Sequence, residues 1–177
     1  MKKLLLTFAA VLLVSFFASA QKKYSVYAVG FYNQENLFDT CHDEGKKDYD
    51  FLPNGSYHWD GLKYSHKLHN MARALADMGT DVLPNVGCAM IGLAEVENAK
   101  VLTDLVNQPA LKARNMQYVH IEGPDKRGID CAMLYNPALF KLESDTLYQY
   151  VQELEKDSAF KTRGFLTIHG RLADEPV

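Results

Sequence analysis

The chain has 177 residues, of which 47% are hydrophobic and 23% are charged, and this is the composition of an ordinary folded domain. Its formal net charge of −3 and its pI of about 6.1 argue against a DNA-packaging or repressor role, because such proteins bind through a strongly basic surface. A nuclease stays compatible with this charge, since a local groove is sometimes basic on an acidic protein.

The N-terminus has the three parts of a secretory signal peptide. Lys2 and Lys3 form a basic start, residues 4–17 are an apolar run, and Ala18-Ser19-Ala20 is a small-residue cleavage site. We therefore predict a signal peptide at residues 1–20 and one domain at residues 21–177, exported to the periplasm or secreted. The alternative is an uncleaved N-terminal anchor. No other run approaches spanning length, so we expect no stable membrane association after cleavage.

The first half of the mature chain predicts a strand, a loop and a helix. Residues 24–32 alternate and are rich in aromatic and β-branched side chains, which favours a strand, and residues 33–39 form a polar loop after it. Residues 40–57 predict a long surface loop. Residues 59–78 predict a helix, with Asp60 as N-cap and Gly79 as C-cap. Its apolar stripe is Leu68, Met71, Ala72, Leu75 and Ala76.

The second half predicts more strands than helices. A loop at 80–87 leads to a central strand at 89–94, and Asn98 caps a helix over 99–113 that Pro109 breaks near Gln108. The later strands are expected at 117–122, 129–135, 140–151 and 164–172, with a charged connection at 152–159. Residues 173–177 look like a turn into a further strand, and none follows. Helices between strands indicate a layered α/β or α+β domain.

The three cysteines of the mature chain are Cys41, Cys88 and Cys131. An odd number without CxxC spacing argues against a zinc site or a disulfide framework. We interpret Cys88 and Cys131 as small buried hydrophobes in strands. The alternative is a disulfide bond between Cys88 and Cys131. A small disulfide-linked structural protein would require this bond.

Glu95 directly follows the apolar run at 89–94, which predicts a strand buried on both faces. A carboxylate at the end of a core strand is costly unless its charge is balanced. Mg²⁺ is a suitable partner, because it binds one or two carboxylates and keeps several waters. The alternative is a solvated strand end. His66 and His69 are three residues apart on the predicted helix, a spacing at which both could bind one metal ion. The alternative is that both lie on a solvated face of the helix.

Three polar clusters fall at predicted strand ends or turns: Asn33 with Glu35, Glu95 with Glu97, and residues 125–130. The stretches 31–39, 91–98 and 127–135 resemble, in this order, three segments of the endonuclease/exonuclease/phosphatase superfamily. The likeness is greatest to its exported bacterial members, in which a helix lies between the first two segments.

The resemblance implies an α+β fold, the DNase I-like four-layer α/β/β/α sandwich. The chain is similar to its N-terminal portion, with outer helices on a mainly antiparallel sheet. The family's second half supplies an Asp-x-Asn segment and a Ser-Asp-His segment, and neither occurs in this sequence. We therefore expect these 177 residues to be impaired or inactive as an enzyme.

The resemblance also implies residue roles. Glu95 matches the glutamate that binds the catalytic Mg²⁺ or Mn²⁺, and Glu35 falls where many members carry an acidic residue near the metal. Asn33 matches the asparagine that contacts the scissile phosphate. Arg127 is a candidate phosphate contact, and Asp130 would orient it by a charge-assisted hydrogen bond, unless Asp130 merely begins a strand.

These residue types suit phosphate-ester hydrolysis. A divalent cation neutralises charge on the phosphoryl oxygens and positions water, while arginine and amide donors hold the phosphate. The predicted function is a divalent-metal-dependent phosphodiester or phosphomonoester hydrolase of nuclease type. Its partner is a phosphate ester, with nucleic acid among the candidates. The alternative is a non-catalytic exported binding or interaction module.

Overall fold

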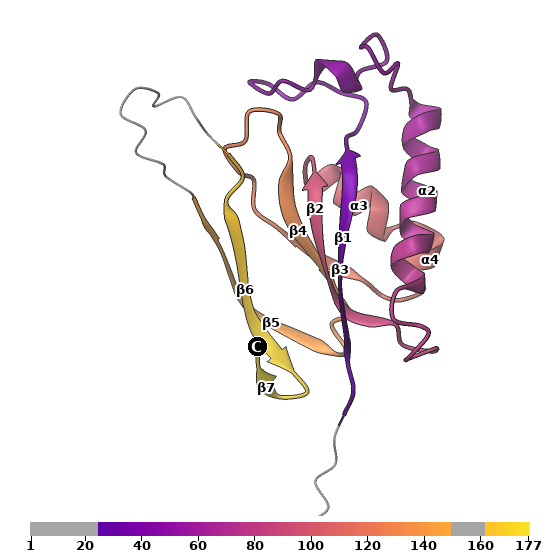
Figure 1. Ribbon diagram of the computed structural model, residues 1–177, viewed down its shortest axis with the longest axis vertical. Coiled ribbons are helices and arrows are strands. Elements are labelled where there is room, and N and C mark those ends of the chain that lie inside the picture. Colours follow the sequence, from indigo (N-terminus) through magenta and orange to yellow (C-terminus); the bar gives the residue numbers. More distant parts are fainter. Residues whose placement is uncertain (1–24, 150–161) are drawn as a thin grey trace, which may run out of the picture.

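The computed structural model describes residues 25–149 and 162–177. Within them a four-stranded sheet lies between a layer of helices and a smaller three-stranded sheet (Figure 1). The predicted signal peptide and the predicted connection at 152–159 lie outside the described residues. Within those residues, no helix has the length and apolar character needed to cross a membrane. The layers agree with the predicted α+β, DNase I-like arrangement.

The larger sheet has the strand order β1-β2-β4-β3. Its strands are β1 (Ala28–Leu37), β2 (Cys88–Val96), β3 (Gln117–His120) and β4 (Asp130–Tyr135). β1 pairs with β2 in parallel, and the other two pairs are antiparallel, as expected of a mainly antiparallel sheet. A parallel pair needs a long crossover, and the segment that carries the first long helix provides it.

Three helices cover one face of this sheet: α2 (Gly61–Asp77), α3 (Ala99–Val106) and α4 (Pro109–Lys112). The predicted N-caps are confirmed, because Asp60 accepts a hydrogen bond from the Lys63 amide and Asn98 from the Val101 amide. The C-cap of α2 is Met78, and Gly79, predicted in that place, follows it with a φ of 74°. The predicted break is also confirmed, since Pro109 starts α4. A short 3₁₀ turn, η1 (Tyr49–Phe51), interrupts the loop that precedes α2.

The smaller sheet consists of β5 (Phe140–Tyr148), β6 (Phe165–Leu172) and β7 (Glu175–Pro176). The strand that the sequence predicts at 140–151 therefore ends at Tyr148. The expectation that no strand follows the turn at residue 173 is wrong, because the two residues of β7 pair with the end of β6. Figure 1 shows this sheet on the side of β4 that faces away from the helices.

The main core lies between the helices and the larger sheet. Its fully buried members include Ile91, Leu93, Leu102, Leu105 and Leu134. A second, smaller cluster on the opposite face contains Val119, Met133, Tyr135 and Phe140.

The prediction that the central strand is buried on both faces is wrong. Met90, Gly92 and Ala94 of β2 are only partly buried, because the smaller sheet covers that face incompletely. A hollow of about 480 Å³ remains there, and Phe31 and Phe165 at its border are about two-thirds exposed.

Both strand cysteines are free thiols, so the alternative of a Cys88–Cys131 bridge is wrong. The register explains this, because Cys131 lies opposite Ala94 while Cys88 lies at the other end of β2. Burial raises the pKa of both thiols. Cys88 is buried and Cys131 partly buried, as predicted for small hydrophobic side chains.

Candidate active site at the ends of β1 and β2

The parallel strands β1 and β2 end at the same edge of the larger sheet. Asn33 lies opposite Ala94, and both strands then leave regular register. Glu35, Asn36 and Glu95 have φ values of 50°, 61° and 63°. A left-handed backbone costs a residue other than glycine roughly 1–2 kcal/mol, so the surrounding contacts must hold these three residues in place.

One hydrogen bond connects the two irregular segments, and another lies within the first of them. The Asn36 amide donates to Oε2 of Glu95 at 3.1 Å, and the Glu35 amide donates to Oδ1 of Asn33 at 2.8 Å. The second bond holds the Asn33 side chain through its Oδ1 acceptor, whereas its donors are on Nδ2. The register places Asn33 opposite Ala94, the residue before Glu95, and the predicted roles of Asn33, Glu35 and Glu95 stay predictions.

Lys67 of α2 holds the same turn from the other side. Its ammonium donates to the carbonyl oxygens of Glu35 and Asn36, the latter at 3.2 Å. Burial lowers the pKa of Lys67, and the nearby carboxylates of Glu35 and Glu95 oppose this shift. The sequence placed Lys67 only on a polar face of the helix, and nothing in the local pattern identified its partner.

Glu97 lies two residues after Glu95 in a different environment, because it is 1% exposed. Its Oε2 accepts the Asp39 amide at 2.6 Å, while Oε1 has no partner among the described residues. Burial raises the pKa of Glu97 to about 8. The Asp39 amide opposes the shift, and the charges of Asp39, Asp43 and Asp48 add to it.

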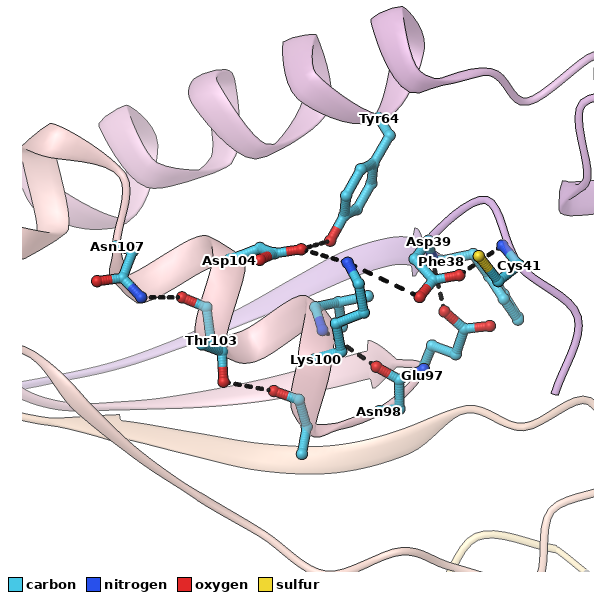
Figure 2. Close-up of polar contacts among 12 residues, drawn as sticks. Phe38, Asp39, Cys41, Tyr64, Glu97, Asn98, Lys100, Thr103, Asp104 and Asn107 are labelled. Atoms are coloured by element: carbon cyan, nitrogen blue, oxygen red, sulfur yellow. Dashed lines mark hydrogen bonds and ion pairs between the residues drawn. The ribbon is translucent and has the colours of Figure 1, made fainter.

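Figure 2 shows how this glutamate joins a polar network between the strand ends and the helices. Lys100 of α3 lies 4.0 Å from Asp39 and 2.6 Å from Asp104. The hydroxyl of Tyr64, on α2, donates to Asp104 at 2.7 Å. Burial, and then the Asp104 carboxylate, raise the pKa of Tyr64. The network connects α2 and α3 to the strand ends that carry the candidate site.

The loop between β3 and β4 reaches the same edge, because Asp130 lies opposite Val96. Asp130 is 3% exposed, accepts the Gly123 amide at 3.1 Å and lies 3.2 Å from Nε2 of His120. Arg127 is paired with Asp125 instead, at 3.6 Å. The prediction that Asp130 orients Arg127 is therefore wrong, and its alternative, the start of a strand, holds.

The burial of Asp130 also bears on its predicted role as a phosphate contact. Its carboxylate is turned inward and acts within the loop, whereas Arg127 is 54% exposed in its side chain. The exposed guanidinium of Arg127 is paired with Asp125, and its predicted phosphate contact stays a prediction. His120, which the sequence analysis gave no role, is the buried partner of Asp130, with a side chain that is 5% exposed.

Two groups of side chains have the donor atoms for a metal ion. The first is Glu95 with Glu35, whose carboxylates are the type of ligand that Mg²⁺ prefers and which are partly exposed and exposed, respectively. The second is His120, Glu122 and Asp130, whose donor atoms lie within 4.8 Å of one another. The Lys46 ammonium already lies 2.8 Å from Glu122 and 3.2 Å from the Gly123 carbonyl. Each group therefore has a lysine ammonium beside it, Lys46 at Glu122 and Lys67 at Glu35 and Glu95. His66 and His69 are exposed and belong to neither group.

A sequence model of the Endonuclease/Exonuclease/phosphatase family matches residues 28–177, so the chain belongs to this family. A comparison with curated proteins found no match. Members of the family are generally hydrolases of phosphate esters that depend on divalent metals.

Proposed function

We propose that the protein is a divalent-metal-dependent hydrolase of phosphate esters, of nuclease type, with its metal and phosphate site at the ends of β1 and β2. The observation that carries this proposal is the hydrogen bond from the Asn36 amide to Glu95. This bond holds a partly exposed carboxylate at the edge where Asn33 and Glu35 also lie. Family membership supports the reaction class, and Mg²⁺ or Mn²⁺ fits the donor atoms.

Each residue has a distinct task in this proposal. Glu95, with Glu35 beside it, would hold the cation, which when bound neutralises phosphoryl charge and lowers the pKa of a water. Asn33 would donate Nδ2–H to a phosphate oxygen, since its Oδ1 is held by the Glu35 amide. Arg127 would contact the phosphate from the neighbouring loop through its planar group of donors. Asp130 acts indirectly, by fixing the loop that carries Arg127.

We expect slow turnover by these 177 residues. The sequence has no Ser-Asp-His segment to orient and deprotonate the attacking water. The absence of a general base typically costs about 10²–10⁴-fold in rate. Cation binding is therefore a more sensitive test of the proposal than the rate of hydrolysis.

The test compares thermal unfolding of the wild type and of Glu95→Gln with and without Mg²⁺. A ligand that binds only the folded state at about 100 times its Kd stabilises it by about 2.7 kcal/mol. For a domain of this size that corresponds to a rise in Tm of roughly 5–10 °C. We expect the wild type to show this rise and Glu95→Gln to lose it. Mg²⁺-dependent hydrolysis of plasmid DNA and of bis-(p-nitrophenyl) phosphate is measured on the same samples.

Glu122→Gln is the matched control, because it makes the same change in the second group of donor atoms at the same edge. Loss of the Mg²⁺ effect in Glu122→Gln, with retention in Glu95→Gln, would move the cation to the His120 cluster and contradict the proposal. No Mg²⁺ effect in any variant would favour the non-catalytic binding module.

We also propose that the protein is exported, because residues 1–20 have the pattern of a signal peptide. The expected result is a mature protein that begins at Gln21, which N-terminal sequencing of the exported material would test. A protein that retains Met1 in the membrane fraction would instead indicate an uncleaved anchor.

A further inference from the structure

A small aromatic pocket adjoins the candidate active site. It has a volume of about 300 Å³ and is lined by Asn36, Phe51, Tyr57, Trp59 and Lys63. That volume is at the lower end of the range for small-molecule sites. The aromatic rings support one another, since the Phe51 centroid lies 5.0 Å from Tyr57 and 6.2 Å from Trp59. The walls of the pocket are therefore held in place before a ligand binds.

Asn36 and Lys67 connect this pocket to Glu95. Asn36 lines the pocket, and its backbone amide donates to Glu95. Lys67 donates to the Asn36 carbonyl and lies 5.6 Å from the centre of the Trp59 ring. The Trp59 indole donates to the Phe38 carbonyl at 3.0 Å, just beyond the end of β1. A group bound in the pocket would therefore be next to a phosphate held at the strand ends.

The charge around the pocket restricts what it binds. The ammonium groups of Lys63 and Lys67 lie at its border, so a quaternary ammonium such as choline would be repelled although the rings resemble a cation cage. A flat, neutral ring attached to an anionic backbone suits both the aromatic walls and the lysines. The side-chain carboxamide of Asn36, a residue that lines the pocket, has hydrogen-bond donors and an acceptor that suit the edge of such a ring.

We propose that this pocket stacks a nucleobase beside the scissile phosphate, so that the phosphate ester is part of a nucleotide or a single-stranded nucleic acid. The inference rests on the proposed function and names its substrate class. Stacking of a base on aromatic side chains depends little on sequence, because every base has a flat face. We therefore assign the pocket to base recognition without strong sequence preference.

The experiment uses Trp59, the single tryptophan of the chain, as the reporter. Purified protein in EDTA is titrated with hexathymidylate and with a hexamer of the same backbone that has no bases, and the change in tryptophan fluorescence gives each Kd. We expect the base-bearing hexamer to bind about tenfold more tightly, within the range for stacking of one base. Tyr57→Ala is expected to reduce this ratio to near one.

Tyr49→Ala is the matched control, because Tyr49 is 60% exposed, as Tyr57 is 57% exposed, but stacks on His42 outside the pocket. It should leave the ratio unchanged. Equal affinity for the two hexamers, or tighter binding of phosphocholine than of either, would overturn the assignment. The measurement needs no metal. A normal Mg²⁺ effect on Tm without base discrimination would therefore contradict the pocket alone, and the reverse result would contradict the metal site alone.

Discussion

Two segments at one edge of the larger sheet each contain a carboxylate, and the two carboxylates differ in burial and in hydrogen-bond partners. At the ends of β1 and β2, Glu95 is partly exposed, and a turn with left-handed backbone lies against it. In the loop before β4, Asp130 is buried, and its carboxylate is bonded to His120 and Gly123. Burial and partners, and not the presence of a carboxylate, therefore distinguish the candidate ligand from the structural residue.

The comparison predicts that stability and metal binding depend on different carboxylates. Groups whose hydrogen bonds lie inside the protein should matter most for folding. Groups that face the solvent at the strand ends should matter most for the cation. Three substitutions test this division, from the largest expected change in stability to the smallest.

Asp130→Ala is expected to lower the free energy of unfolding by about 2–4 kcal/mol, because it leaves the His120 ring and the Gly123 amide without their partner in a buried loop. Urea denaturation measures the change. Glu95→Ala is the comparison, and we expect it to cost less than about 1 kcal/mol, since its carboxylate is partly exposed. An equal loss in both variants would remove the distinction between the two segments.

Glu97→Gln is expected to change how stability depends on pH. The pKa of Glu97 in the folded protein is about 8, above its ordinary value, so the folded state holds a proton that the unfolded state releases. This contribution is fully present below about pH 4.5 and is lost as the pH rises through 8. The variant should therefore resemble the wild type near pH 4.5 and be more stable by roughly 2 kcal/mol near pH 6, with a larger difference near pH 8.

Glu44→Gln provides the control for that experiment, since it makes the same chemical change at an exposed side chain. Denaturation at a series of pH values should give parallel curves for Glu44→Gln and the wild type. A wild-type slope that persists in Glu97→Gln would show that another group binds the proton.

Lys67→Met should have the smallest effect of the three, a loss of about 1 kcal/mol, because it removes two hydrogen bonds that solvent partly replaces. Lys63→Met is its control on the same helix, since the Lys63 ammonium bonds only the Tyr57 carbonyl at an exposed position. Chemical denaturation at pH 7 compares the two variants. A greater loss of stability in Lys63→Met would show that the hydrogen bonds from Lys67 to the Glu35 and Asn36 carbonyls contribute nothing to the free energy of unfolding.

Features that depend on neighbours in sequence were predictable. The caps at Asp60 and Asn98 and the break at Pro109 follow from local hydrogen bonding and from the missing amide of proline. The assignment of Asn33 and Glu95 to one site came from the resemblance to a family and not from periodicity, and the register places Asn33 opposite Ala94, the residue before Glu95.

The contacts of Lys67 and Asp130 were not predictable, because each depends on how distant segments pack. Lys67 meets carbonyl groups more than 30 positions earlier in the chain, and the helix pattern specifies only its face. The pairing of Asp130 with His120 depends on the β3–β4 register, and a shift of one residue would turn one of these side chains to the opposite face. The aromatic pocket was also missed, since its ring contacts form within a long irregular loop.

The parallel pairing of β1 with β2 has a kinetic consequence. Asn36 and Glu95 are 59 positions apart, whereas the strands of the β3–β4 hairpin are close in the chain. Contacts between distant positions form slowly, because a long stretch of chain must be ordered before they are gained. We expect the cation site to assemble after the rate-limiting step of folding. Mg²⁺ would then slow the unfolding of the protein and leave its refolding rate nearly unchanged, so that the ion prolongs the life of the native state without guiding the chain toward it.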